Sequence, residues 1–165
     1  AGDPEGSILQ KLRIHNVILV GSDYDRDIFS GYLEDGLLDV MEKLTIYLSD
    51  TDKALCISKF VFTRRRLGQA FMPENISPAV HDYLQRTNNL ILVDVTNAAG
   101  AATGNGHSYF RKSPWVSSDV LMTLKYDLPP GERGLVRHKS MPAWTFPKDY
   151  TSRLKQQLET RIGLE

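Results

Sequence analysis

The stretch LILVDV at residues 90–95 decides the fold class, because it is a nearly unbroken apolar run rich in branched side chains. Two earlier runs share this character, VILV at residues 17–20 and LTIYL at residues 44–48. Short apolar runs bounded by turn-forming residues are typical of strands that are covered on both faces, as in a parallel sheet. Segments with helical spacing separate the three runs. The sequence therefore predicts an α/β fold in which βαβ crossovers join about three parallel strands.

Helical patterns flank these strands, and prolines mark the end of the regular part of the chain. We expect helices within residues 23–33, 36–43, 52–61, 77–85 and 113–126. From Asp127 onward the prolines interrupt the chain, which predicts an extended segment over 127–147. An amphipathic helix is expected over 148–162. We therefore divide the chain into a body at 7–126 and an irregular tail at 127–165 that packs on the body with its terminal helix.

An acid and a histidine follow two of the predicted strands. Asp52 comes shortly after the second strand, and His107 lies in the loop GNGHS that follows the third. In parallel sheets, ligands bind at the carboxyl ends of the strands, so both loops are expected to share one edge. An acid followed by a histidine is the second half of a Ser…Asp…His triad in the chain order of α/β-hydrolases. No Gly-x-Ser-x-Gly occurs in these 165 residues, so the sequence predicts the acid and the base without the nucleophile.

Four motifs in a fixed order carry a family resemblance. They are GSDYDRDIF at 21–29, TIYLS at 45–49 with DKAL at 52–55, RLG at 66–68, and GHSYF at 106–110. Together they resemble an uncharacterised bacterial branch of the α/β-hydrolase superfamily, whose members are similar to lipases and esterases. The resemblance covers roughly residues 12–126 and is limited to the carboxyl-terminal part of such a domain. It implies that Asp52 is the triad acid and His107 the general base, with the catalytic serine on an elbow upstream.

Other side chains compete for these roles on the same predicted edge. Asp23, Asp25 and Asp50 are alternative acids, and Asp52 could instead cap a helix. Ser22 lies on a Gly-Ser turn after a strand, but this turn lacks the second glycine of a nucleophile elbow. The acid therefore stays open among four residues, with Asp52 favoured.

A metal site is the main alternative use of the acidic residues. The spacing of Asp23, Asp25 and Asp27 is similar to the start of a calcium-binding loop, but the required Gly and terminal Glu do not follow. The remaining histidines have no ligand spacing: His15, His81 and His138. We therefore predict no metal, and triad chemistry requires no cofactor.

Composition excludes several classes of function. The 20 Lys and Arg residues balance the 20 Asp and Glu residues, which leaves no electrostatic footprint for a nucleic-acid backbone. The basic run at 64–66 is interpreted as a solvated turn. Cys56 is the single cysteine, so no internal disulfide can form. The apolar run at 17–21 is far shorter than the roughly 20 residues of a transmembrane helix, and we favour the cytoplasm as the compartment.

Two functions follow from these patterns. The first is the carboxyl-terminal portion of a serine hydrolase that acts on a small ester or similar acyl substrate. The second is a non-catalytic α/β module for interaction or assembly. A partial sheet leaves a strand edge unpaired, which a protein must cover. We therefore expect self-association or a partner that supplies the missing half, with Trp144 and Phe146 as a candidate cover.

Overall fold

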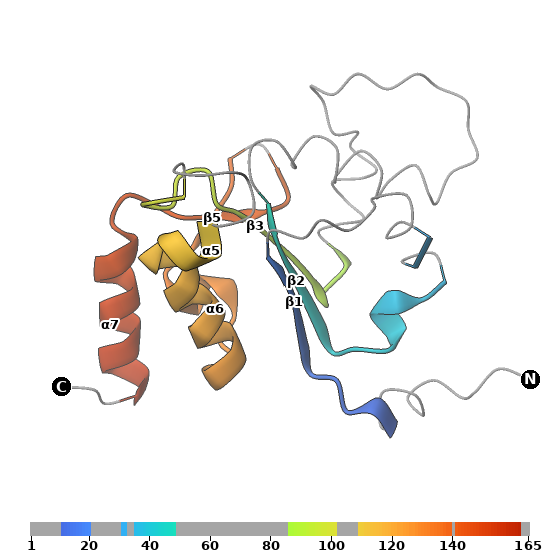
Figure 1. Ribbon diagram of the computed structural model, residues 1–165. Coiled ribbons are helices and arrows are strands. Elements are labelled where there is room, and N and C mark those ends of the chain that lie inside the picture. The colour runs from blue at the N-terminus through green and yellow to red at the C-terminus, as the bar shows by residue number, and fades with distance from the viewer. Residues whose placement is uncertain are drawn as a thin grey trace, which may run out of the picture.

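The computed structural model describes residues 11–20, 31–32, 35–48, 86–101, 109–139 and 141–162. In these ranges the elements are, in chain order, β1 (Asn16–Val20), η1 (Leu37–Asp39), β2 (Lys43–Leu48), β3 (Leu90–Asp94), α5 (Tyr109–Lys112), α6 (Pro114–Tyr126), η2 (Pro130–Arg133), β4 (Val136–Arg137), β5 (Trp144–Thr145) and α7 (Tyr150–Ile162). Figure 1 shows α5, α6 and α7 on one side of the strands and the segment that contains η1 on the other. The fold is therefore a layered α/β arrangement.

The strands form one sheet in the order β1-β2-β3-β5-β4. β1, β2 and β3 are parallel, with Ile18 opposite Thr45 and Thr45 opposite Ile91. β5 adds to β3 in parallel through two residues, and β4 pairs with β5 antiparallel. The prediction of an α/β fold with three parallel strands at the three apolar runs is confirmed. The two short strands of the tail are an addition to it.

Alternation along the strands divides the core into two halves. Leu44, Ile46 and Leu48 of β2 pack in the core on one face of the sheet, with Leu90 and Leu92 of β3. The intervening residues of the same two strands, such as Tyr47 and Val93, belong to the core on the opposite face. Successive side chains of a strand point to opposite faces, so a strand that is apolar at every position needs cover on both.

Helix α6 begins and ends where its sequence indicates. The Ser113 hydroxyl accepts a hydrogen bond of 3.3 Å from the backbone N–H of Val116, and Pro114 occupies the first turn. Asp127 ends the helix in the left-handed conformation, with φ at 50°. The prediction of a helix over 113–126 is thus confirmed, and the structure adds its caps.

The predicted helix at 36–43 is wrong. Only one 3-10 turn forms there, η1, and it starts after Gly36, which has φ at 90°. The apolar residues of this segment instead pack as a turn against the sheet, and Glu42 and Lys43 already donate backbone hydrogen bonds to Ile14 and His15. Pairing with β1 therefore overrides the helical spacing. The helices expected at 52–61 and 77–85, and most of the one at 23–33, lie outside the described residues.

The chain after α6 returns to the sheet and then packs on it. Phe146, Tyr150 and Leu154 are buried in the same core as Val116 of α6. The Phe146 and Tyr150 rings pack edge to face, with their centroids 4.8 Å apart. The Trp115 ring of α6 has its centroid 5.3 Å from that of Tyr150. The segment expected to be merely extended also contains η2, β4 and β5. Within the described ranges, none of the helices combines the length and apolar character needed to cross a bilayer.

Candidate active site at the carboxyl edge of the sheet

The carboxyl ends of the parallel strands meet at one edge of the sheet. Leu48, the last residue of β2, lies opposite Asp94, the last residue of β3. Val20 at the end of β1 lies opposite Tyr47. The carboxyl ends of these strands therefore lie side by side, as Figure 1 shows for β2 and β3. Loops at this edge are where open α/β sheets bind ligands.

The side chains predicted to act at this edge lie outside the described residues. This holds for both favoured residues, Asp52 and His107, and for the alternatives, Asp23, Asp25, Asp50 and Ser22. What the structure describes is the framework from which their loops depart. Asp52 follows Leu48 by four positions, and His107 follows Asp94 by thirteen.

Asp94 is the described acid at this edge, and it organises the start of the loop that leads to His107. Its side chain is buried, and Oδ1 accepts hydrogen bonds from the backbone N–H of Thr96 at 2.9 Å and from the Thr96 hydroxyl at 2.6 Å. An aspartate that binds the backbone two residues onward forms an Asx turn. The direction in which the chain leaves β3 is thus fixed by this carboxylate.

A second histidine lies near this acid. The Nε2 atom of His138 is 3.6 Å from Oδ2 of Asp94, and the imidazole is 22% exposed. Its backbone N–H donates to the carbonyl of Ala143, which closes the connection between β4 and β5. His138 has no ligand spacing in the sequence, because its pairing with Asp94 spans 44 positions and depends on β5 joining β3. The Asp-x-Thr spacing was the available signal for the Asx turn.

A buried polar network lies on the side of the sheet covered by α6. Oδ2 of Asp119 accepts from the Tyr47 hydroxyl at 2.6 Å, and Oδ1 accepts from Nε of Arg133 at 2.8 Å. Burial raises the pKa of Asp119, and the Arg133 guanidinium opposes that shift. Burial, followed by the neighbouring Asp119 charge, raises the pKa of Tyr47 well above its ordinary value. The network ties β2, α6 and η2 together.

No group of three or more His, Cys, Asp or Glu side chains converges as a metal site would in the part of the chain that the structure describes.

Comparison with known families decides the assignment. Residues 5–124 match the family model described as Alpha/beta hydrolase of unknown function (DUF900). The chain belongs to this family. Searches of curated proteins and of solved structures gave no match.

The DUF900 match confirms the resemblance to the α/β-hydrolase superfamily that the four motifs indicated. It spans β1, β2 and β3 and includes positions 52 and 107. It ends within α6, so η2, β4, β5 and α7 lie beyond the matched segment. Within the described residues, the matched segment thus holds the three parallel strands, α5 and most of α6.

Proposed function

We propose that this chain is the carboxyl-terminal portion of a serine hydrolase for a small ester or similar acyl substrate. In this proposal Asp52 is the triad acid, His107 is the general base, and the nucleophilic serine lies on a segment outside this sequence. The observation that carries the proposal is the register of β2 and β3, in which Leu48 and Asp94 are neighbours. The loops bearing the acid and the histidine therefore leave adjacent strands at the same edge.

The chemistry assigns a distinct task to each residue. His107 takes the proton of the serine hydroxyl during attack on the acyl carbon and gives it to the departing alkoxide. Asp52 accepts the other ring N–H, which fixes the tautomer and stabilises the imidazolium as it forms. The serine must lie within hydrogen-bonding distance of the imidazole, and backbone N–H groups must face the oxyanion. This chain would thus contribute the proton-transfer half of the machinery.

The environment of β1 supports a partner that supplies the other half. All five residues of β1 are only partly buried, whereas β2 is buried at five of its six positions. Among the described strands, β2 is the one hydrogen-bonded to β1. An unpaired edge of a parallel sheet favours addition of another strand. We infer that a segment bearing the Gly-x-Ser-x-Gly elbow pairs along Asn16–Val20.

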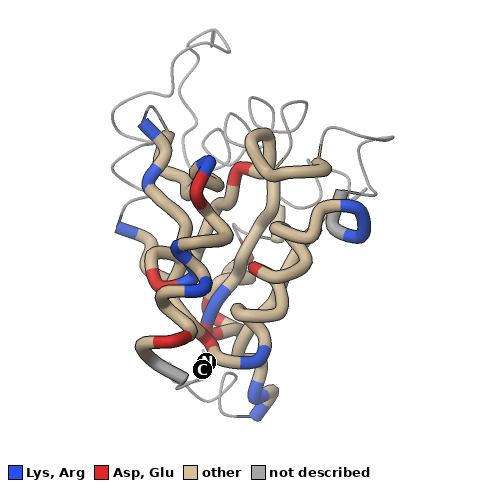
Figure 2. Tube along the Cα trace, turned by 90° about the vertical axis from the view of Figure 1, so that its left-hand side faces the viewer, with Lys and Arg blue, Asp and Glu red and all other residues tan. Residues whose placement is uncertain are grey.

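The charge distribution supports a small uncharged substrate. Figure 2 shows basic and acidic residues interspersed along the described trace. The formal net charge of the whole chain is zero. A surface on which positive and negative charges are mixed offers little long-range attraction to a polyanion. An uncharged ester does not need such electrostatic attraction in order to bind.

Complementation tests the proposal. The chain is mixed with a polypeptide that carries an α/β-hydrolase elbow and its upstream strands, and hydrolysis of p-nitrophenyl acetate is followed. We expect turnover that neither component shows alone. His107→Ala should abolish it, with a loss of roughly a thousandfold or more for a triad residue. The matched control is His15→Ala, because His15 is exposed, pairs with Glu42 and precedes β1 at the opposite end.

Labelling with a fluorophosphonate locates the nucleophile. We expect the label on the elbow serine of the added polypeptide. Modification of a serine of this chain, with activity lost when that serine is replaced, would contradict the assignment of the nucleophile to another segment. A stable complex whose turnover survives His107→Ala would instead support the role of an assembly module.

A further inference from the structure

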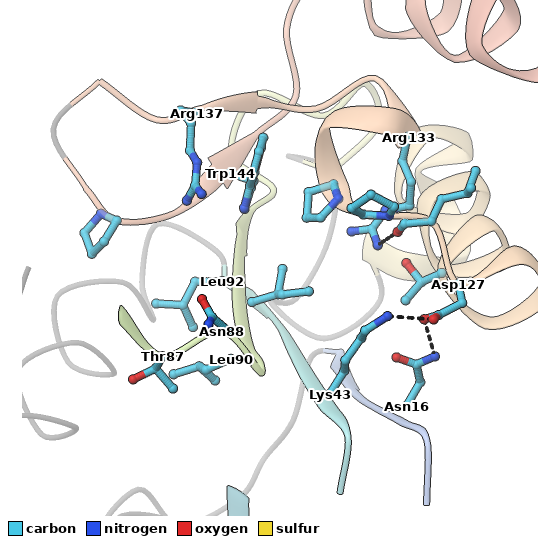
Figure 3. A pocket seen from close by; sticks show the side chains of 16 residues that line it. Asn16, Lys43, Thr87, Asn88, Leu90, Leu92, Asp127, Arg133, Arg137 and Trp144 are labelled. Atoms are coloured by element: carbon cyan, nitrogen blue, oxygen red, sulfur yellow. Dashed lines mark hydrogen bonds and ion pairs between the residues drawn. The ribbon is translucent and has the colours of Figure 1, made fainter. Parts of the chain in front are cut away.

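A cavity of about 210 Å³ lies at the end of the sheet opposite the candidate active site. Its walls include Asn16, Lys43 and Leu90, the first residues of β1, β2 and β3. From there it extends along β3 toward β5 and beneath η2, as Figure 3 shows. The cavity therefore includes the amino ends of the three parallel strands, whereas the candidate active site is expected at their carboxyl ends.

One part of the wall is apolar and the volume suits a small organic molecule. Leu90 and Leu92 of β3, Pro142 and the Trp144 indole contribute to it. Arg137 stacks on Trp144, with its guanidinium carbon 4.1 Å from the ring centroid. For comparison, an engineered cavity of about 150 Å³ accommodates benzene. A ligand with a single ring or a short aliphatic body fits this space.

The charged side chains of the wall are predominantly basic. Among the described residues of the wall, Lys43, Arg133 and Arg137 contribute positive charges, and Asp127 contributes the one negative charge. Asp127 is already engaged, since Lys43 Nζ lies 2.6 Å from its Oδ2 and the Asn16 amide donates to its Oδ1 at 2.9 Å. Those two hydrogen bonds lower the pKa of the Asp127 carboxyl, with the one from Lys43 the larger cause. The balance of the wall favours an anion.

The decisive feature is a buried hydrogen-bond donor without an acceptor. Arg133 is fully buried; its Nε donates to Asp119 and its Nη1 to the Leu128 carbonyl at 2.9 Å. Its Nη2 has no hydrogen-bond partner among the described residues. Figure 3 shows this side chain reaching down from η2 toward the interior of the pocket. A buried polar group without a partner costs free energy, so such a donor next to a cavity points to an acceptor on a ligand.

We propose that this cavity binds a small carboxylate with an apolar body. The carboxylate would lie by Arg133, where an oxygen accepts from Nη2, and the body would lie against Leu90, Leu92 and Trp144. Charge-assisted hydrogen bonds to a guanidinium are stronger than neutral ones, so an anionic acceptor at Nη2 is favoured over a neutral one. Asn16 Oδ1 is a buried acceptor without a hydrogen-bond partner among the described residues, and it can accept a hydrogen bond from a hydroxyl or amino substituent of the ligand. The site does not depend on the proposed hydrolase activity.

Titration of the full chain with sodium benzoate at constant ionic strength tests this site, with the amide and indole N–H signals followed by NMR. For a ligand of this size we expect saturation with a dissociation constant of about 1 mM. The Trp144 indole signal should shift, and that of Trp115, which does not line the cavity, should not. Benzamide has the same shape without the charge and should bind at least about tenfold more weakly.

Variants separate the site from general charge attraction. Lys43→Gln and Arg137→Gln should each weaken benzoate binding about three- to tenfold, since both remove a cation from the wall. Lys155→Gln removes an equally positive but exposed side chain of α7 and should leave the affinity unchanged. Arg133→Lys keeps the charge and removes Nη2, and it should lower the affinity by tenfold or more.

Three results would overturn the proposal: equal binding of benzoate and benzamide, equal effects of Lys43→Gln and Lys155→Gln, or no saturable shift at Trp144 up to about 20 mM. Because Arg133 also pairs with Asp119, its variant is judged only if its spectrum is that of a folded chain. If Arg133→Lys does not fold, two comparisons decide whether the cavity binds a carboxylate. They are benzoate against benzamide, and Lys43→Gln against Lys155→Gln.

Discussion

Arg133 and Asp119 form an ion pair in the interior, with Nε 2.8 Å from Oδ1 and both side chains at most 1% exposed. The pair joins η2 to α6, and the Tyr47 hydroxyl extends it to β2. Removing one member of a buried pair leaves the other charge without compensation, which costs far more than losing an exposed pair. The stability of the fold therefore depends on this ion pair, which also holds the Arg133 guanidinium in place at the cavity.

Asp119→Asn is therefore expected to destabilise the protein. The free energy of unfolding should fall by about 3–5 kcal/mol, the usual cost of breaking a buried ion pair from one side. Urea unfolding followed by circular dichroism measures the change. Asp149→Asn, the same substitution in the exposed pair with Arg153, is the control and should leave the unfolding midpoint unchanged. If both variants lost the same free energy of unfolding, the result would contradict the burial of the pair between Asp119 and Arg133.

Burial of two tyrosines gives a prediction for alkaline solution. Burial is the largest cause of the raised pKa of both Tyr47 and Tyr150, so both phenols stay protonated in the fold above pH 10.0, their ordinary pKa. A group whose pKa is raised in the folded state stabilises it below the unfolded pKa and loses that contribution as pH rises further. Stability should thus fall above about pH 10. Phenolate absorbance should report at least two fewer ionised tyrosines in the folded chain than in urea.

Asp127 gives the opposite dependence in acid. Its lowered pKa means that its contribution is present above the ordinary value of 3.8 and disappears as pH falls through the folded pKa. Asp127→Asn keeps a residue that tolerates the left-handed conformation at the end of α6. Below about pH 4 the variant should therefore lose less stability than the parent protein. This difference in stability between the variant and the parent protein should shrink in high salt, because the Asp127 carboxylate is more than half exposed.

Two glycines near η2 test how closely this turn packs against α7. Gly134 has φ at 88°, and an added Cβ would lie 3.1 Å from the backbone nitrogen of Leu154. Gly134→Ala should therefore lower the free energy of unfolding by about 1–2 kcal/mol. Gly131→Ala is the matched control, because its Cβ would meet only the Trp144 ring at an ordinary 3.7 Å. A smaller loss at Gly134 than at Gly131 would contradict the packing of α7 on η2.

The sequence predicted those elements whose determinants are local. Continuous apolar runs mark β1, β2 and β3, and the Ser113-Pro114 start marks α6, so these elements follow from neighbouring residues. The segment at 36–43 has helical spacing, but pairing of Lys43 with Asn16 draws it into the sheet. β4 and β5 are two residues long and depend on contact with β3, which local patterns do not encode.

For the candidate site, the sequence predicts only the edge of the sheet at which it is expected. The order of an acid and a histidine after parallel strands identifies the edge, because carboxyl ends of parallel strands share one side of a sheet. The pairing of His138 with Asp94 and of Arg133 with Asp119 required the tail to fold back on the sheet. Asp119 falls on the buried stripe of α6 with Val116, which signals burial but does not reveal the partner. Long-range pairs of this kind need the tertiary structure.

The most direct test of the central claim is an NMR titration of the His107 ring in the parent chain, in Asp52→Asn and in Asp50→Asn. A carboxylate bonded to an imidazole stabilises its protonated form, so removing the charge lowers the pKa of the ring. We predict that Asp52→Asn lowers the pKa of His107 by about one unit or more, and that Asp50→Asn leaves it unchanged. A His107 pKa that Asp52→Asn does not move, or that Asp50→Asn moves as far, would contradict the assignment of Asp52 as the triad acid.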